Sequence, residues 1–85
     1  MNTVQVTLEL PRTVLSALRK EPAAFVADMR VAAAVKWYEL EIVSQAKAAE
    51  IAGLTRAEFL VALQRLGVSP FQSSIEELLA ESRDD

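Results

Sequence analysis

The side chains that most often carry out catalysis are scarce in this chain. It has 85 residues with no cysteine and no histidine, so it offers no thiolate nucleophile, no imidazole acid–base group and no Cys/His zinc site. Its two glycines, Gly53 and Gly67, are too far apart for a phosphate-cradling loop. The carboxylates fall on predicted polar helix faces. The sequence therefore predicts a binding protein and not an enzyme, with no metal and no cofactor.

A first set of side chains suited to binding lies near the N-terminus. Residues 3–10 alternate strictly between polar and apolar types, which is typical of a strand with one buried face. The polar face carries Thr3, Gln5 and Thr7, which can hydrogen-bond to bases. No second strand is predicted later in the chain, so the simplest pairing is with the same strand of a second copy. Such a ribbon would enter the major groove of DNA, as in ribbon-helix-helix proteins; the alternative is a solvated strand face.

A second set belongs to residues 44–67, whose pattern is typical of a helix-turn-helix. Ser44 can cap a first helix that ends at Gly53, a residue that suits the left-handed conformation of a tight turn. Thr55 and Glu58 then form a capping box, T-R-A-E, that opens the second helix. An ordinary helical hairpin is the alternative interpretation of this spacing.

The exposed face of that second helix is of mixed character. Thr55, Arg56 and Gln64 suit base edges or phosphates and are the candidate DNA contacts. Leu60 and Val61 lie on the same face and suit a protein partner better. The pattern alone leaves both kinds of partner open.

The third candidate is the acidic C-terminal tail, residues 73–85. Three aliphatic side chains, Ile75, Leu78 and Leu79, fall on one side of a possible short helix, and Arg83 lies near its tip. An amphipathic segment of this kind fits a groove on a partner protein. The alternative is a frayed terminus.

The elements that must position these side chains are mostly helical. Residues 11–20 predict a short helix, and Pro22 is well placed to begin a long helix that runs to about Ile42. This long helix has two apolar stripes on nearly opposite sides, so we expect it to lie between two layers, one of them a second subunit. One stripe holds Phe25, Val26, Met29, Ala33, Trp37 and Leu40, and the other holds Val31, Val35, Tyr38 and Ile42. The predicted dimer interface comprises Val4, Val6, Leu8, Val31, Val35 and Tyr38.

The expected fold class is mainly α: one N-terminal β-strand, ribbon-helix-helix-like and paired in a dimer, followed by a helix-turn-helix. Residues 1–72 are predicted to form a single domain, with the helix-turn-helix at 44–67 and the tail at 73–85. The chain is 52% hydrophobic, and surplus apolar surface in so short a chain favours an obligate partner. Its net charge of −3 counts against bulk phosphate binding. Neither a secretion signal nor a membrane span is predicted, so the expected location is the cytoplasm.

Three stretches of the sequence resemble a known family. They read V-T-L-E-L-P, A-A-V-K-W-Y-E and S-Q-A-K-A-A-E-I-A-G-L-T-R-A-E-F-L-V-A-L-Q-R-L-G-V. Together they resemble the uncharacterised protein family UPF0175 over about residues 4–72. Members of that family are small prokaryotic proteins, generally interpreted as antitoxins, whose usual neighbour is a toxin with a PIN-type ribonuclease fold. The positions that match its core pattern are Lys47, Ala48, Ala49, Gly53, Leu54 and Phe59, and they look structural.

The resemblance implies an antitoxin that neutralises a ribonuclease and binds its own promoter as a dimer. The expected partners are thus a second copy, a toxin protein and promoter DNA, with no membrane and no small-molecule substrate. The alternative function is a protein-interaction adaptor that uses the helix-turn-helix as a scaffold and binds no DNA.

Overall fold

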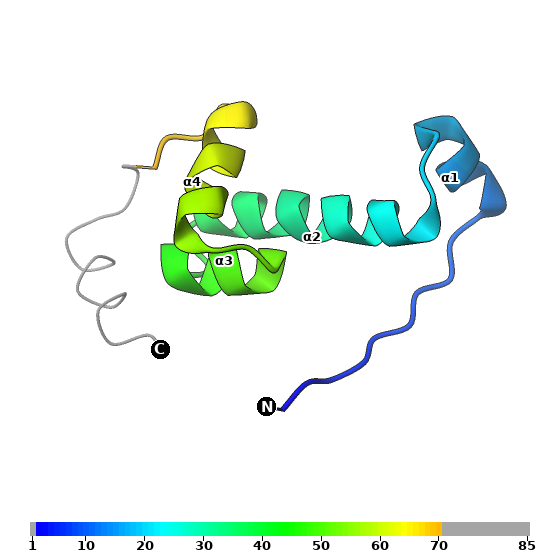
Figure 1. Ribbon diagram of the computed structural model, residues 1–85, viewed down its shortest axis with the longest axis horizontal. Coiled ribbons are helices and arrows are strands. Elements are labelled where there is room, and N and C mark those ends of the chain that lie inside the picture. The colour runs from blue at the N-terminus through cyan, green and yellow to red at the C-terminus, as the bar shows by residue number, and fades with distance from the viewer. Residues whose placement is uncertain (1, 71–85) are drawn as a thin grey trace.

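The computed structural model describes residues 2–70 and is built around one long helix (Figure 1). Its helices are α1 (Arg12–Leu18), α2 (Pro22–Glu39), α3 (Gln45–Ala52) and α4 (Arg56–Arg65). The second half of α2 packs against α3 and α4, which also pack against each other. The short α1 lies beside the other end of α2, and none of its residues is buried.

The N-terminal arm, residues 2–10, contains no strand, and neither does the rest of the described chain, residues 11–70. The predicted β-strand over residues 3–10, and with it the ribbon-helix-helix-like element, is therefore wrong. Alternation is a pattern of side chains, whereas a strand also requires a neighbouring strand to accept and donate the backbone hydrogen bonds. Residues 11–70 offer no such neighbour, and the arm runs extended and exposed (Figure 1).

The ends of α3 and α4 follow directly from their capping residues. The Ser44 hydroxyl accepts a hydrogen bond from the Lys47 N–H at 3.1 Å and begins α3. Gly53 ends α3 in the left-handed conformation, with φ of 73°. The capping box of Thr55 and Glu58 has both of its hydrogen bonds, at 3.1 and 2.9 Å. The helix and turn boundaries predicted over residues 44–55 are confirmed.

The first two helices are shorter than their sequence patterns predict. After α1, Arg19 takes a left-handed conformation with φ of 55°, which stops the helix. The predicted start of α2 at Pro22 is confirmed, but the helix ends at Glu39. Glu41, with φ of 61°, turns the chain towards α3. The apolar periodicity of the sequence continues through Leu40 to Ile42. It therefore gives no sign that the helix ends before this turn.

The core lies where α2, α3 and α4 meet. Its largest fully buried side chains are Tyr38, Phe59 and Leu63. The rings of Tyr38 and Phe59 pack edge to face, with centroids 6.0 Å apart and planes at 85°, a favoured aromatic geometry. Small side chains fill the remaining contacts and let the helices approach closely: Ala34, Ala48, Ala49, Ala52 and Ala62. A rigid three-helix unit of this kind can hold α4 in a fixed orientation.

Within residues 2–70, none of the helices combines the length and the apolar character needed to cross a membrane.

Candidate functional site

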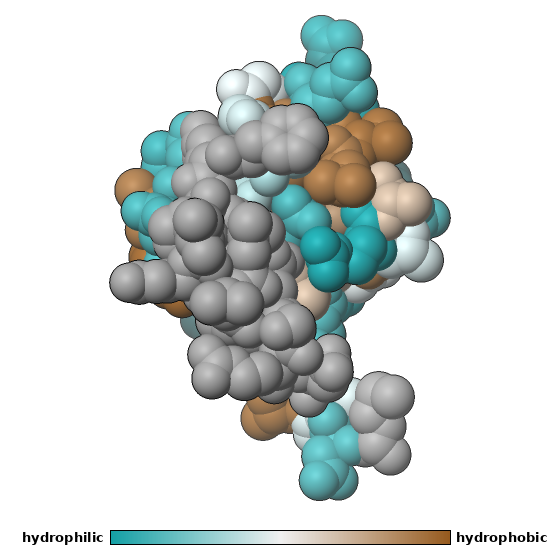
Figure 2. Space-filling model, turned by 90° about the vertical axis from the view of Figure 1, so that its left-hand side faces the viewer, coloured by the Kyte–Doolittle hydropathy of each residue, from teal (hydrophilic) through white to brown (hydrophobic). Residues whose placement is uncertain are grey.

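The outer face of α4 is the surface that the helix-turn-helix presents. Phe59, Ala62 and Leu63 face the core, while Leu60 and Val61 are 39% and 56% exposed. Viewed from the end of the molecule that carries α3 and α4, apolar surface adjoins hydrophilic surface at the height of α4 (Figure 2). Gln64 also lies on the exposed side. This face combines one amide side chain with two aliphatic ones, so it can contact a protein as readily as a base pair.

Arg56, at the start of α4, belongs to a polar network that reaches into the core. Its guanidinium donates from Nε and Nη2 to Oε1 of Gln45, at 3.2 and 2.6 Å. Gln45 is buried and donates in turn to the Tyr38 hydroxyl at 3.3 Å and to the Pro70 carbonyl at 3.4 Å. The Tyr38 hydroxyl donates to that same carbonyl at 3.0 Å. The network satisfies a buried amide, as buried polar groups require, and ties residue 70 to α2 and α3.

The predicted DNA contacts of α4 therefore have different roles. Thr55 uses its hydroxyl in the capping box, and Arg56 directs its guanidinium to Gln45. Gln64 remains on the outer face, and exposed Arg65 follows it in the last turn of the helix. The sequence reasoning did not single out Arg65, although its place one residue after Gln64 puts it beside the predicted surface.

Arg30 is a second residue that the sequence did not indicate. Its Nε donates to the carbonyl oxygen of Ile51 at 2.8 Å, across 21 residues of sequence. An added Cβ on Gly53 would lie 3.2 Å from both terminal nitrogens of the same guanidinium. Arg30 thus fastens the middle of α2 to the end of α3 and covers the turn of the helix-turn-helix. Only the folded geometry brings these residues together, so no local pattern could have found the contact.

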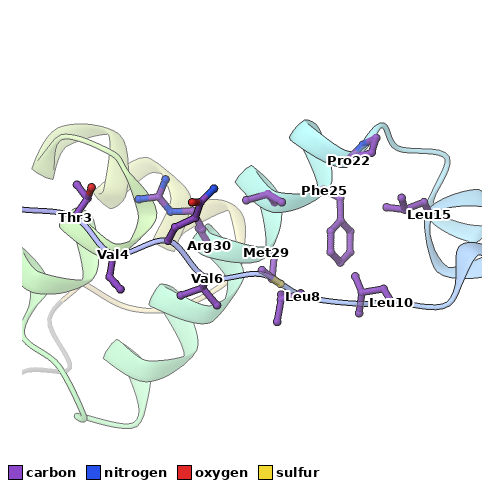
Figure 3. A pocket seen from close by; sticks show the side chains of 12 residues that line it. Thr3, Val4, Val6, Leu8, Leu10, Leu15, Pro22, Phe25, Met29 and Arg30 are labelled. Atoms are coloured by element: carbon purple, nitrogen blue, oxygen red, sulfur yellow. The ribbon is translucent and has the colours of Figure 1, made fainter.

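A groove lies between the N-terminal arm and the first half of α2 (Figure 3). Its volume is about 820 Å³, and its lining is mostly apolar. Phe25 and Met29 point from α2 towards the arm, where Leu8 and Leu10 lie (Figure 3). The groove is open, and Leu8 and Leu10 keep about half of their surface exposed. The arm therefore lines an unfilled apolar groove rather than closing a core.

The match to a family model agrees with the motifs on α2, α3 and α4. The model of the uncharacterised protein family UPF0175 matches residues 1–84. The chain belongs to this family. No curated protein and no solved structure matches the chain. The description of UPF0175 names no activity.

The predicted N-terminal DNA contacts of the UPF0175 chain have no ribbon to carry them. Thr3 and Gln5 lie on the arm and line the groove beside α2. Thr7 is on the same arm and is exposed. Without a paired strand, the three side chains are not held on one rigid face.

The residues predicted for the dimer interface fall into two groups in the UPF0175 chain. Val35 and Tyr38 are buried in its own core, at 4% and 1% exposure, and Val31 packs against them. In this conformation Val35 and Tyr38 have no surface left for a second copy, because α3 and α4 already cover that stripe of α2. Val4, Val6 and Leu8 are on the arm and remain exposed.

The predicted toxin contacts Ile75, Leu78, Leu79 and Arg83 lie outside the described residues. Across residues 2–70, no cluster of three or more His, Cys, Asp or Glu side chains could hold a metal ion. The candidate site of the described chain comprises the outer face of α4 and the groove beside α2.

Proposed function

We propose that this UPF0175 chain is a dimeric, antitoxin-like regulator that holds a partner toxin and binds its own promoter DNA. The observation that carries the proposal is the α3–turn–α4 unit, in which Gly53 makes the turn and the capping box of Thr55 starts an outward-facing helix. Helix-turn-helix proteins use such a second helix to contact the major groove. The toxin partner, a PIN-type ribonuclease, comes from the family resemblance.

The distribution of charge along the chain favours DNA binding by the helical domain and toxin binding by the C-terminal segment. Residues 1–72 carry eight basic and seven acidic side chains, whereas residues 73–85 carry one basic and five acidic ones. The net negative charge of the chain therefore belongs to its C-terminal segment. Without the C-terminal segment, residues 1–72 have a net charge of +1, from eight basic and seven acidic side chains. The negative charge of the whole chain is thus a weaker argument against DNA binding by the helical domain. An acidic, partly aliphatic segment suits a basic, grooved surface on a protein.

The DNA arm of the proposal is tested with a labelled fragment from upstream of the gene's own coding sequence. We expect specific binding that weakens steeply as salt is added, because phosphate contacts release counterions. Gln64→Ala should weaken binding roughly 5- to 100-fold, the cost of one good base contact. Thr13→Ala is the control, since it removes an exposed polar side chain of α1 that belongs neither to α4 nor to the lining of the groove. Arg56→Ala is a poorer probe because it also removes the two hydrogen bonds that Oε1 of buried Gln45 accepts.

The toxin arm is tested by truncation after Gln72. We expect the truncated chain to keep its helical fold and to lose neutralisation of the ribonuclease encoded beside it. Full neutralisation by the truncated chain would contradict the assignment to the tail. The α4 face would then be the next candidate, and Leu60→Glu would test it.

A protein-interaction adaptor that binds no DNA is the second candidate function. Two observations favour it: Leu60 and Val61 occupy the outer face of α4, and the guanidinium of Arg56 is engaged by Gln45. The two functions differ in one measurement. Negligible affinity for the upstream fragment at low salt would leave the adaptor as the function to pursue.

A further inference from the structure

The long helix α2 has an apolar stripe that the core does not use. The stripe consists of Val26, Met29, Ala33 and Trp37 on α2 and of Leu40, the residue directly after its end. α3 and α4 pack on the opposite stripe, where Val35 and Tyr38 are buried. On the unused side, Val26 is 46% exposed, Trp37 is 42% exposed and Leu40 is 55% exposed. Contiguous exposed apolar surface of this extent on a small protein marks an interaction site.

The spacing of the stripe is symmetric about its centre. From Val26 to Leu40 the steps are three, four, four and three residues, so Ala33 is the midpoint. From Val26 to Leu40 the stripe covers fourteen residues in four turns. This average of about 3.5 residues per turn is close to that of an α-helix, so the stripe drifts only slightly around the helix axis. A surface that reads the same in both directions is self-complementary under a two-fold rotation, as an isologous dimer interface must be.

We propose that a second copy of this chain packs its α2 antiparallel against this stripe, with the two-fold axis at Ala33. Trp37 of each chain then faces Met29 of the other, and Leu40 faces Val26. The small Ala33 side chains meet at the centre and let the helix axes approach closely. The inference rests on the dimeric state in the proposed function, and it assigns the interface to the stripe of α2 opposite to Val35 and Tyr38.

The groove beside α2 receives part of the second copy in this arrangement. Val26 and Met29 line the groove of about 820 Å³ together with the apolar side chains of the arm. The two-fold axis places Trp37 and Leu40 of the second copy opposite Met29 and Val26. The side chains of Trp37 and Leu40 therefore enter the groove. Leu8 and Leu10 lie on the arm, across the groove from α2 (Figure 3). In the proposed dimer they cover Trp37 and Leu40 of the second copy from that side.

The exposed apolar area is sufficient for such a dimer. The seven large apolar side chains of the arm and the stripe are each 42–86% exposed: Val4, Val6, Leu8, Leu10, Val26, Trp37 and Leu40. Together they expose on the order of 700 Å² per chain, close to the roughly 800 Å² per partner that a stable interface buries. The half-buried Phe25 and Met29 add to this area.

The first experiment measures the solution mass of the full chain by light scattering over a dilution series. We expect two chains for the unmodified protein. Trp37→Glu and Met29→Lys should each reduce the mass to one chain, because each places a charge opposite an apolar side chain. The double variant should restore two chains, because every new glutamate then faces a new lysine. Val61→Glu, at a comparably exposed position on α4, is the matched control and should leave the mass unchanged.

The second experiment uses the absence of native cysteine. In Ala33→Cys the two thiols meet at the two-fold axis, within the 4.4–6.8 Å Cα separation that a disulfide needs. Mild oxidation should therefore convert the protein to a covalent dimer, while Val61→Cys should stay uncrosslinked. Failure of Ala33→Cys to crosslink, a monomeric unmodified chain, or a double variant that stays monomeric would each overturn the proposal.

The same variants separate this inference from the proposed function. A chain that dimerises through the stripe but binds neither the upstream DNA nor the neighbouring ribonuclease would leave the interface standing and overturn the function. If Trp37→Glu instead keeps the mass of two chains and loses only the ribonuclease, the stripe belongs to that partner and the inference fails.

Discussion

The turn between α3 and α4 provides a prediction whose magnitude follows from the structure. Gly53→Ala places a side chain in a left-handed conformation, which costs about 1–2 kcal/mol. About 0.4–1 kcal/mol of that is recovered because alanine restricts the unfolded chain more than glycine does. The new Cβ also lies 3.2 Å from the guanidinium nitrogens of Arg30. Arg30 must therefore shift, which strains its 2.8 Å hydrogen bond to the Ile51 carbonyl, a bond worth about 1 kcal/mol.

We therefore expect Gly53→Ala to lower the free energy of unfolding by about 2 kcal/mol, from the conformational and contact costs together. Gly67→Ala is a matched control: its φ of 72° is nearly the same, but an added Cβ meets nothing within 4 Å. Its expected cost is the conformational part alone, about 1 kcal/mol or less. Urea unfolding followed by circular dichroism, at one protein concentration, measures both values.

An Arg30→Ala background isolates the contact in a double-mutant cycle. Without the guanidinium, Gly53→Ala should cost about as much as Gly67→Ala, which corresponds to a coupling of about 1 kcal/mol between Gly53 and Arg30. If Gly53→Ala and Gly67→Ala are equally destabilising in the unmodified background, the Arg30 guanidinium moves away from the new Cβ without lowering the free energy of unfolding. The account of how α2 braces the turn would then be refuted.

Three further changes probe the ends and the buried network of the helical unit. Tyr38→Phe removes the hydroxyl that donates to the Pro70 carbonyl at 3.0 Å and should lower the free energy of unfolding by about 1 kcal/mol; an unchanged urea midpoint would mean that the Gln45 amide alone holds Pro70. Thr55→Ala removes the acceptor for the Glu58 N–H and should also cost about 1 kcal/mol, with Thr7→Ala on the arm as a control that leaves the midpoint in place. Glu41→Gly relieves a side chain at φ of 61° and should raise the free energy of unfolding by about 0.5 kcal/mol, so a loss of stability on thermal unfolding would show that Glu41 makes a contact worth more than the strain.

Local signals in the sequence predicted the helix-turn-helix well. Ser44, Gly53 and the capping box of Thr55 begin or end helices through contacts with residues at most four positions away in the sequence. Their effects can therefore be recognised without knowledge of the fold. The boundaries of α3 and the start of α4 agree with those signals. By contrast, the left-handed turns at Arg19 and Glu41 have no glycine to mark them.

Other features depended on which elements meet in space. Alternation over residues 3–10 indicated which side chains share a face, but it could not supply the neighbouring strand that a ladder requires. The two stripes of α2 were both visible in the sequence, yet only packing could decide that α3 and α4 cover Val35 and Tyr38 and leave Trp37 and Leu40 open. In the same way, Gln45 accepts hydrogen bonds from the Arg56 guanidinium across eleven residues of sequence, a contact of an exposed side chain that no local pattern could predict.

The exposed N-terminal arm has a consequence for the lifetime of the protein. Exposed segments outside secondary structure are the preferred sites of proteolytic nicking, and residues 2–10 are exposed throughout. A second copy bound in the groove would shield the arm from proteases. The fraction of chains in this dimer rises with protein concentration. Cleavage would then be fastest when the protein is scarce. A cell that stopped making it would lose the remaining molecules at an accelerating rate.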